Sequence, residues 1–218
     1  MKNKDKKPKS SIDNFESPDF YNLDDLLTQE HIMIRNSIRD FVKKEISPFI
    51  EDWSEKNYFP SEIVGKMGEI GIFGPTTSEK YGGGGLDYIS YGIIMQEIER
   101  GDSGMRSTAS VQSSLVMFPI EEYGSEEQKN KFLPKLASGK ILGCFGLTEP
   151  DHGSNPSGMK TKCEDKGDHY LLNGSKMWIS NSPEADIAIV WAKDENERIK
   201  GLIVERGMSG FTTPKTEG

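Results

Sequence analysis

The chain falls into two stretches that differ in how hydrophobic residues are spaced. Up to about residue 140, apolar side chains recur at intervals of three and four residues, as in amphipathic helices. After Lys140 this spacing gives way to short apolar runs, which indicate β-strands. We therefore predict an α+β chain, with an N-terminal helical bundle followed by an antiparallel β-sandwich or barrel. The expected parts are a flexible leader (1–22), a helical domain (23–140) and a β-domain (141–218).

Several helix boundaries can be predicted from single residues. Thr28 is suited to cap the first helix, and Pro48 should kink or restart it. Asp87 is placed to cap a later helix, and Ser125 opens the S-x-x-Q form of a capping box. Two stripes are expected to be buried: Ile34, Ile38, Phe41, Val42, Phe49 and Trp53, and then Ile89, Ile93, Ile94 and Ile98.

The second stretch is predicted to contain strands and no helix. Asn173-Gly174 lies between two β-rich runs and is a strong signal for a hairpin turn. Since no helical pattern separates the strands, we expect them to pair in antiparallel fashion. The expected strands cover residues 141–148, 160–164, 169–172, 177–180, 187–192, 201–204 and 210–213.

Charge and composition exclude some classes of partner. The chain has 27 Lys and Arg against 35 Asp and Glu, a net charge of −8, which disfavours nucleic acid or an anionic membrane as the main partner. No apolar run approaches the roughly 20 residues that a membrane span needs. Met1–Lys9 resembles neither a secretory signal nor a transit peptide. With Cys144 and Cys163 expected to be reduced, we predict a cytoplasmic, bacterial-type protein.

Common catalytic patterns are not apparent. The run Gly82–Gly85 lacks the strand, helix and Lys context of a phosphate-binding loop, so a flexible turn is the favoured interpretation. His31 and His169 are expected at the surface, and no histidine or cysteine pair has the spacing of metal ligands. We assign no catalytic residue and no metal.

Two segments group polar side chains beside predicted strands. Residues 143–159, GCFGLTEPDHGSNPSGM, run from a strand into hydroxyls and free amides that could bind a polar planar group or an anion. Residues 176–182, KMWISNS, follow an aromatic side chain with hydroxyls and an amide. From composition alone the first is more simply a polar connection and Trp178 a core residue.

Together these segments resemble the acyl-CoA dehydrogenases, FAD enzymes that oxidise acyl-CoA thioesters. The motifs are GLTEPDHGSNPSGM and LNGSKMWISNSPEADI, and the resemblance covers nearly everything from Leu23 to Gly218. It implies a helical domain, a middle β-domain and a C-terminal helical domain that this chain does not contain. It also implies a homotetramer in full-length relatives and an electron-transfer flavoprotein as electron acceptor.

The resemblance implies a role for each residue that matches the family motifs. Ser154 would reach both the flavin side and the substrate's pantetheine or phosphate region. Asn155 stands where most relatives have Asp, and Ser180 where many have Thr, a change that keeps the hydroxyl. The implied FAD contacts are Phe145, Leu147, Thr148, Ser154, Trp178, Ile179 and Ser180.

Within the family the chain is most similar to the glutaryl-CoA dehydrogenases. The segment SGMRSTASVQSSLVMFPI places Arg106 and Ser107 where that branch has an Arg-Ser pair facing the free carboxylate of the substrate. Arginine suits this role because its planar guanidinium can bind a carboxylate through two parallel hydrogen bonds. The alternative is that Arg106 is an ordinary surface or helix-capping cation.

The resemblance also indicates what the chain lacks. In relatives a Glu of the C-terminal domain removes the proton alpha to the thioester, and neither Glu99 nor Glu149 matches it. We therefore expect no turnover, and weak or no FAD retention, from residues 1–218 alone. Three hypotheses follow: part of a glutaryl-CoA dehydrogenase that forms crotonyl-CoA and CO2, part of another acyl-CoA dehydrogenase, or a truncated paralogue that acts as a binding module.

Overall fold

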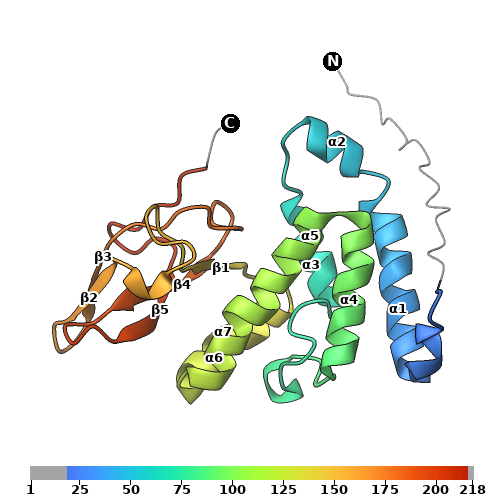
Figure 1. Ribbon diagram of the computed structural model, residues 1–218, viewed down its shortest axis with the longest axis horizontal. Coiled ribbons are helices and arrows are strands. Elements are labelled where there is room, and N and C mark those ends of the chain that lie inside the picture. The colour runs from blue at the N-terminus through green and yellow to red at the C-terminus, as the bar shows by residue number, and fades with distance from the viewer. Residues whose placement is uncertain (1–18, 216–218) are drawn as a thin grey trace.

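The helical half and the sheet half of the molecule lie side by side and meet at strand β1 (Figure 1). The computed structural model describes residues 19–215, so the first 18 residues of the expected leader lie outside the described part. The helical elements are η1 (Leu23–Leu26), α1 (Gln29–Phe41), η2 (Val42–Ile46), α2 (Ile50–Glu55), α3 (Ser61–Glu69), η3 (Glu79–Tyr81), α4 (Tyr88–Gly101), α5 (Ser103–Ser110), η4 (Val111–Met117), α6 (Phe118–Tyr123) and α7 (Glu126–Ala137).

The predicted helix caps are confirmed. The Thr28 hydroxyl accepts from the His31 amide at 3.2 Å, the Asp87 carboxylate from the Ser90 amide, and Ser125 forms a reciprocal capping box with Gln128. Each cap satisfies an amide that the first turn of a helix leaves without a backbone partner. The restart at Pro48 is also confirmed, because a turn separates η2 from α2.

The buried stripes are confirmed with two corrections, and the expected exposure of His31 is a third error. Ile38 and Ile98 lie in the helical core, but Phe49 and Ile89 are 37% and 54% exposed. His31, expected at the surface, is buried, because its Nε2 reaches the carboxylate of Asp87 at 3.0 Å and joins the start of α1 to the cap of α4. A histidine that bonds two helix ends can leave water without losing hydrogen bonds.

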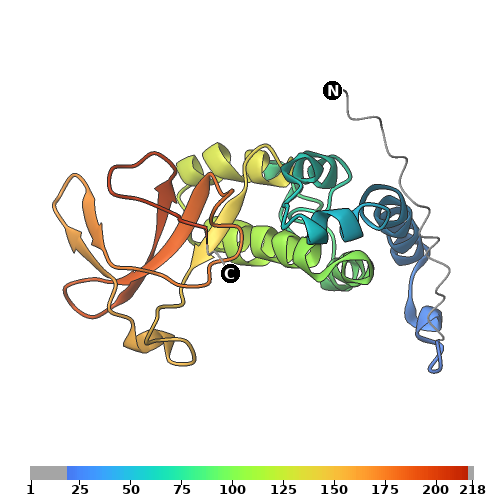
Figure 2. The same ribbon diagram turned by 90° about the horizontal axis from the view of Figure 1, so that it is seen from above.

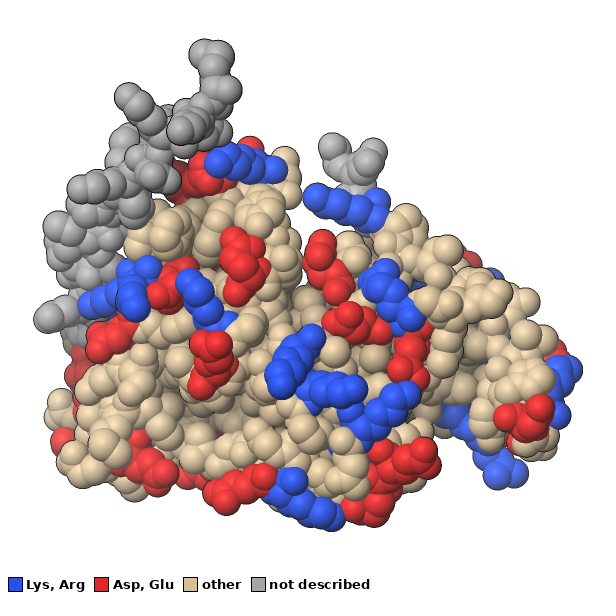
Figure 3. All heavy atoms as spheres, turned by 180° about the vertical axis from the view of Figure 1, so that it is seen from behind, with Lys and Arg blue, Asp and Glu red and all other residues tan. Residues whose placement is uncertain are grey.

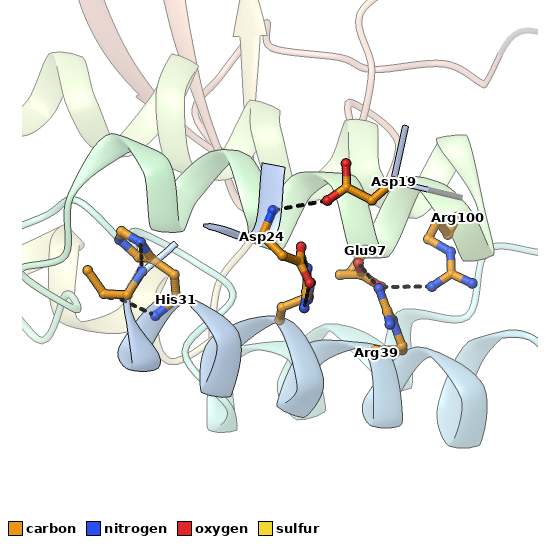
Figure 4. A network of polar contacts seen from close by, with 8 residues as sticks. Asp19, Asp24, His31, Arg39, Glu97 and Arg100 are labelled. Carbon is orange, nitrogen blue, oxygen red and sulfur yellow. Dashed lines mark hydrogen bonds and ion pairs between the residues drawn. The ribbon is translucent and has the colours of Figure 1, made fainter. Parts of the chain in front are cut away.

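An ion network fixes α1 against α4 further along the same interface (Figure 4). The Glu97 carboxylate is 1% exposed and accepts two hydrogen bonds of 2.8 Å from Arg39 and one of 3.1 Å from Arg100. Nearer the chain start, Arg35 pairs with Asp24 of η1. A buried carboxylate needs such partners, since removing a charge from water is costly.

The fold class is confirmed, but the sheet is mixed rather than antiparallel. The central strand β4 pairs in parallel with β1, in parallel with β2 at Lys162 and Lys193, and antiparallel with β5. A parallel pair needs a long connection, and residues 147–186 between β1 and β4 supply it without a helix of the α type. The strands are β1 (Gly143–Gly146), β2 (Lys162–Asp165), β3 (Tyr170–Asn173), β4 (Ile187–Lys193) and β5 (Ile199–Glu205).

The prediction of a hairpin turn at Asn173-Gly174 is wrong in position. β2 and β3 are joined by the turn in which the Lys166 amide donates to the carbonyl of His169, so Asn173-Gly174 ends a hairpin instead of turning one. Gly174 instead allows close approach, because a Cβ there would lie 2.4 Å from the Thr161 hydroxyl. The expected strands at 177–180 and 210–213 are irregular chain.

The run Gly82–Gly85 folds as a turn that main-chain hydrogen bonds hold in place. The amides of Gly83, Gly84 and Gly85 donate to the carbonyls of Ser78, Gly74 and Thr77. A phosphate cradle would need those amides to point at the ligand. The structure therefore favours the turn over the phosphate loop.

The two halves share one core. Seen from above, the sheet edge formed by β1 lies against the helices (Figure 2). Ile187 and Ile189 of β4 belong to the same buried cluster as Val116 and Leu136 of the helical half. The face in Figure 3 intersperses basic and acidic side chains. Within the described residues no helix is long and apolar enough to cross a membrane.

Candidate functional site

The two polar segments singled out in the sequence meet where β1 ends. The Met177 amide donates to the carbonyl of Thr148 at 2.9 Å, and the Lys176 ammonium donates to the carbonyl of Leu147 at 3.1 Å. Two loops about 30 residues apart in sequence are thus held side by side. Of the predicted FAD contacts, Phe145 lies in β1, Leu147 and Thr148 lie in the loop that follows it, and residues 178–180 lie in the other loop.

A buried ion pair lies directly behind this junction. The Glu149 carboxylate accepts from the amides of Lys160 and Thr161 at 2.7 and 3.0 Å, from the Thr161 hydroxyl at 2.5 Å, and from Lys176 at 2.9 Å. The Glu149 side chain is 5% exposed and that of Lys176 10%. Burial raises the pKa of Glu149, but the four donors outweigh it and bring the pKa to about 2.

Trp178 presents its indole to the outside of this junction. Its side chain is 78% exposed, and the backbone is left-handed with φ of 57°. The interpretation of Trp178 as a core residue is therefore wrong. A bulky residue with positive φ is strained, and such strain is typical of functional loops. An exposed indole offers an apolar face on which a planar ring can stack.

Several hydroxyls near the junction have no protein partner. Within the described residues, the side-chain oxygens of Thr148, Ser180 and Ser154 make no hydrogen bond to another residue. Free hydroxyls beside an exposed indole place hydrogen-bond donors and acceptors next to an apolar face. Ser154 differs in position, since it lies in the exposed loop before η5 (Pro156–Gly158), and within the described residues its side chain makes no hydrogen bond to the other predicted residues.

Arg106 already binds a carboxylate in the structure. Its Nε donates to Glu99 at 2.5 Å and its Nη1 to the hydroxyl of Ser110 at 3.3 Å. Hydrogen bonds from Arg106 and Ser103 lower the pKa of Glu99 below its ordinary value. Arg106 therefore has a carboxylate partner when no substrate is present and does not need a carboxylate-bearing substrate to be paired. Its Nη2 has no partner among the described residues.

The helix that carries Arg106 reaches this junction through a hydrogen bond. Thr108, two residues after Arg106 on α5, donates to the side-chain carbonyl of Asn181 at 3.2 Å. Ser107 has a half-buried side chain, and within the described part of the chain its hydroxyl makes no hydrogen bond. α5 thus contacts the loop that carries Trp178.

Sequence reasoning singled out residues 176–182 but gave Lys176 and Asn181 no structural role, and it did not place Glu99 beside Arg106. Glu99 reaches Arg106 across the corner between α4 and α5, which helical periodicity cannot describe. Lys176 follows a β-rich run and reads as a surface cation, although it is buried. An Asn directly after the Trp-Ile-Ser segment was the available signal for Asn181, because Asn tolerates the left-handed conformation, here with φ of 67°.

Two family models match this chain in tandem. Residues 28–140 match the acyl-CoA dehydrogenase N-terminal domain, and residues 144–218 match the acyl-CoA dehydrogenase middle domain. The matches cover the helical half and the sheet half in turn.

Curated proteins and a solved structure are similar over most of the chain. A glutaryl-CoA dehydrogenase from Desulfococcus multivorans is 43% identical over 199 residues, which are 88% of this chain and 51% of that protein. An acyl-CoA dehydrogenase from Bacillus subtilis (strain 168) is 42% identical over 88% of this chain and 52% of its own length. The crystal structure of a glutaryl-CoA dehydrogenase from Mycobacterium smegmatis in complex with FADH2 gives a TM-score of 0.88 at 46% identity, covering 90% of this chain and 50% of that one. The chain thus spans about half the length of its relatives.

Proposed function

This chain belongs to the acyl-CoA dehydrogenase family, and from that premise we propose that it forms the flavin-facing and acyl-facing part of a glutaryl-CoA dehydrogenase. The observation that carries the proposal is the junction at the end of β1, where free hydroxyls and an exposed indole lie beside the helix that bears Arg106. The domain division at residue 140 is part of this proposal.

FAD is the cofactor that this surface is proposed to hold. Phe145 in β1 and Leu147 and Thr148 in the loop after it would line the ring from one side, and residues 178–180 from the other, with Ser154 reaching toward substrate and cofactor. Bound FAD would supply the acceptor for the hydride removed from the acyl chain. The chain's own contribution is orientation: the Glu149–Lys176 pair holds both loops, so their hydroxyls and amides are fixed before the ring arrives.

Arg106 is proposed to select a substrate with a free carboxylate. In the structure its guanidinium binds the Glu99 carboxylate through Nε and keeps Nη2 for another acceptor. A dicarboxylic acyl group, such as glutaryl, could therefore bind as a second carboxylate on the same guanidinium, next to the Ser107 hydroxyl. The similarity to glutaryl-CoA dehydrogenases supports this choice.

The general base is not assigned within this chain. The Glu149 carboxylate accepts four hydrogen bonds, and the Glu99 carboxylate accepts hydrogen bonds from Arg106 and Ser103. Neither carboxylate is therefore placed to remove a proton from a substrate. We propose that residues 1–218 do not turn over substrate alone. An electron-transfer flavoprotein as redox partner, a tetrameric assembly of the whole protein and a cytoplasmic location belong to the same proposal.

The second candidate function is that of another acyl-CoA dehydrogenase with Arg106 incidental. It is favoured by the 42% identity to an acyl-CoA dehydrogenase of B. subtilis and by the Glu99 pairing, which leaves Arg106 satisfied without a dicarboxylic substrate. A non-catalytic binding module is the third possibility.

Titration calorimetry with glutaryl-CoA and butyryl-CoA distinguishes the first two candidate functions. We expect the wild-type chain to prefer glutaryl-CoA, and Arg106→Ala to reduce the ratio of the two affinities about tenfold or more, since a charge-assisted hydrogen bond is lost. Arg106→Lys should give an affinity ratio between those of the wild type and Arg106→Ala, because a point charge replaces a planar guanidinium.

Arg198→Ala is the matched control, since Arg198 is exposed in the turn between β4 and β5. An Arg106→Ala chain with unchanged preference would overturn the glutaryl assignment. A wild-type chain that binds neither thioester nor FAD in equilibrium titration would count against the family function of this fragment and in favour of the binding module.

A further inference from the structure

Gly143, the first residue of β1, has both of its backbone polar groups bound by side chains. Its amide donates to the side-chain oxygen of Gln112 at 2.8 Å, and its carbonyl accepts from the side-chain nitrogen of Asn181 at 3.2 Å. The oxygen of the same Asn181 amide accepts from the hydroxyl of Thr108 at 3.2 Å. Asn181 therefore bridges α5 and β1 with the two ends of one amide group.

The helix side of this bridge is a stripe with a spacing of four residues. Thr108, Gln112 and Val116 are all buried, and a Cβ on Gly143 would lie 2.5 Å from a methyl group of Val116. Gln112 also donates to the carbonyls of Leu136 and Ile141, so its amide group is fully engaged. The contact is too close to permit sliding of the helix along the strand.

The loop side is fixed by the backbone of Asn181. Its left-handed φ of 67° turns the chain, and its carbonyl accepts from the amides of Glu184 and Ala185 at 3.0 and 2.9 Å. Trp178 stands three residues earlier in the same irregular segment. The position of this segment against the helical half therefore depends on the Asn181 side chain.

We propose that Asn181 is a positioning residue that couples α5, the helix of Arg106, to the loop of Trp178. Thr108 orients the Asn181 amide, and Asn181 in turn sets where the 178–180 segment stands relative to β1. What the coupled surfaces bind rests on the proposed function; the coupling itself does not.

Hydrogen exchange of the 177–182 peptide tests the coupling in the chain without any ligand. Asn181→Gly removes the amide and keeps a backbone that accepts positive φ, so added strain does not confuse the result. We expect exchange about tenfold faster for this variant, and the same direction for Thr108→Val, which lies some 70 residues away in sequence. The double variant should add little to either single change, because both remove the same bridge.

Thr108→Ser is the conservative rescue, since it keeps the hydroxyl, and Ser182→Ala is the matched control in the same loop. A Thr108→Val chain with wild-type exchange at 177–182, or a Thr108→Ser chain as fast as Thr108→Val, would overturn the coupling. If Asn181→Gly fails to fold, the Thr108 pair decides alone.

A fluorescence titration with FAD forms the second arm. The two bridge variants should raise the dissociation constant about tenfold over the Ser182→Ala control. Accelerated exchange in a chain whose wild-type form binds neither FAD nor an acyl-CoA thioester would support the coupling and count against the proposed function. Unaltered exchange in the two bridge variants, together with normal FAD binding by the wild type, would overturn the coupling and support the proposed function.

Discussion

Two buried carboxylates, Glu97 in the helical half and Glu149 in the sheet half, hold the molecule together in different ways. Glu97 binds two arginine side chains, one from each of the helices α1 and α4 (Figure 4). Glu149 binds two main-chain amides, a hydroxyl and Lys176. The first joins helices whose shape is already set by their own backbone hydrogen bonds. The second defines the path of chain that has no regular structure.

The consequence is a difference in what each carboxylate controls. A helix keeps its geometry when an interface ion pair is lost, because its internal hydrogen bonds remain. The loops around Glu149 have no such ladder, so their course depends on the carboxylate itself. Since those loops carry Thr148 and Trp178, only Glu149 is expected to couple stability to the candidate site.

Removing the sheet-half carboxylate should have the largest effect. Glu149→Ala leaves the Lys176 ammonium buried and deprives three other donors of their acceptor, so we expect a loss of about 3–5 kcal/mol in the free energy of unfolding. Chemical denaturation measures the loss, and FAD titration of the folded protein should show weaker binding. Glu149→Gln, which keeps the acceptor oxygen without the charge, should lose less. Equal losses for the two variants would contradict a role for the charge.

The helical-half carboxylate should matter less and only for stability. In Glu97→Ala the Arg39 guanidinium can turn toward water, since its side chain is already 35% exposed, so we expect a loss of about 2–3 kcal/mol. FAD titration should give the wild-type dissociation constant at temperatures where the variant is folded. A drop in FAD affinity as large as that of Glu149→Ala would break the comparison between the two halves.

The same contrast explains what the sequence could predict. Caps such as Thr28 and Ser125 act on amides two or three residues away, so local sequence identifies them, and the helical half was predicted with few errors. The errors there, at Phe49, Ile89 and His31, concern burial. Burial depends on which helix face meets a neighbour, and periodicity alone does not supply that.

The sheet half was harder because its pairings are not local. The parallel pairing of β1 with β4 joins residues that are 44 positions apart in sequence, such as Gly143 and Ile187, and the sequence of neither strand predicts it. The candidate site could be located only through family motifs. These identified both loops but not the roles of Lys176 and Asn181, which arise from segments far away in sequence.

Acid should remove the contribution of the Glu149 charge. The pKa of Glu149 is about 2 when folded, below its ordinary value of 4.5, so its charge stabilises the fold above pH 4.5 and this contribution is lost as pH falls from 4.5 to 2. The unfolding free energy of the wild type should therefore fall more steeply across this window than that of Glu149→Gln. Parallel curves for the two proteins, measured by denaturant titration at several pH values, would contradict the lowered pKa.

The smallest expected effect supplies the baseline for the comparison. Ser125→Ala removes the hydroxyl that accepts from the Gln128 amide at the start of α7, and we expect a loss of about 1 kcal/mol. The cap is exposed and has no contact with either carboxylate network, so FAD affinity and the pH dependence below 4.5 should match the wild type. Ser125→Asp should restore most of the stability, because aspartate is an equally good cap and carries a negative charge at a helix N-terminus. Were Ser125→Ala to weaken FAD binding, general loss of stability would account for the Glu149 result, and the proposed link between that carboxylate and the site would fail.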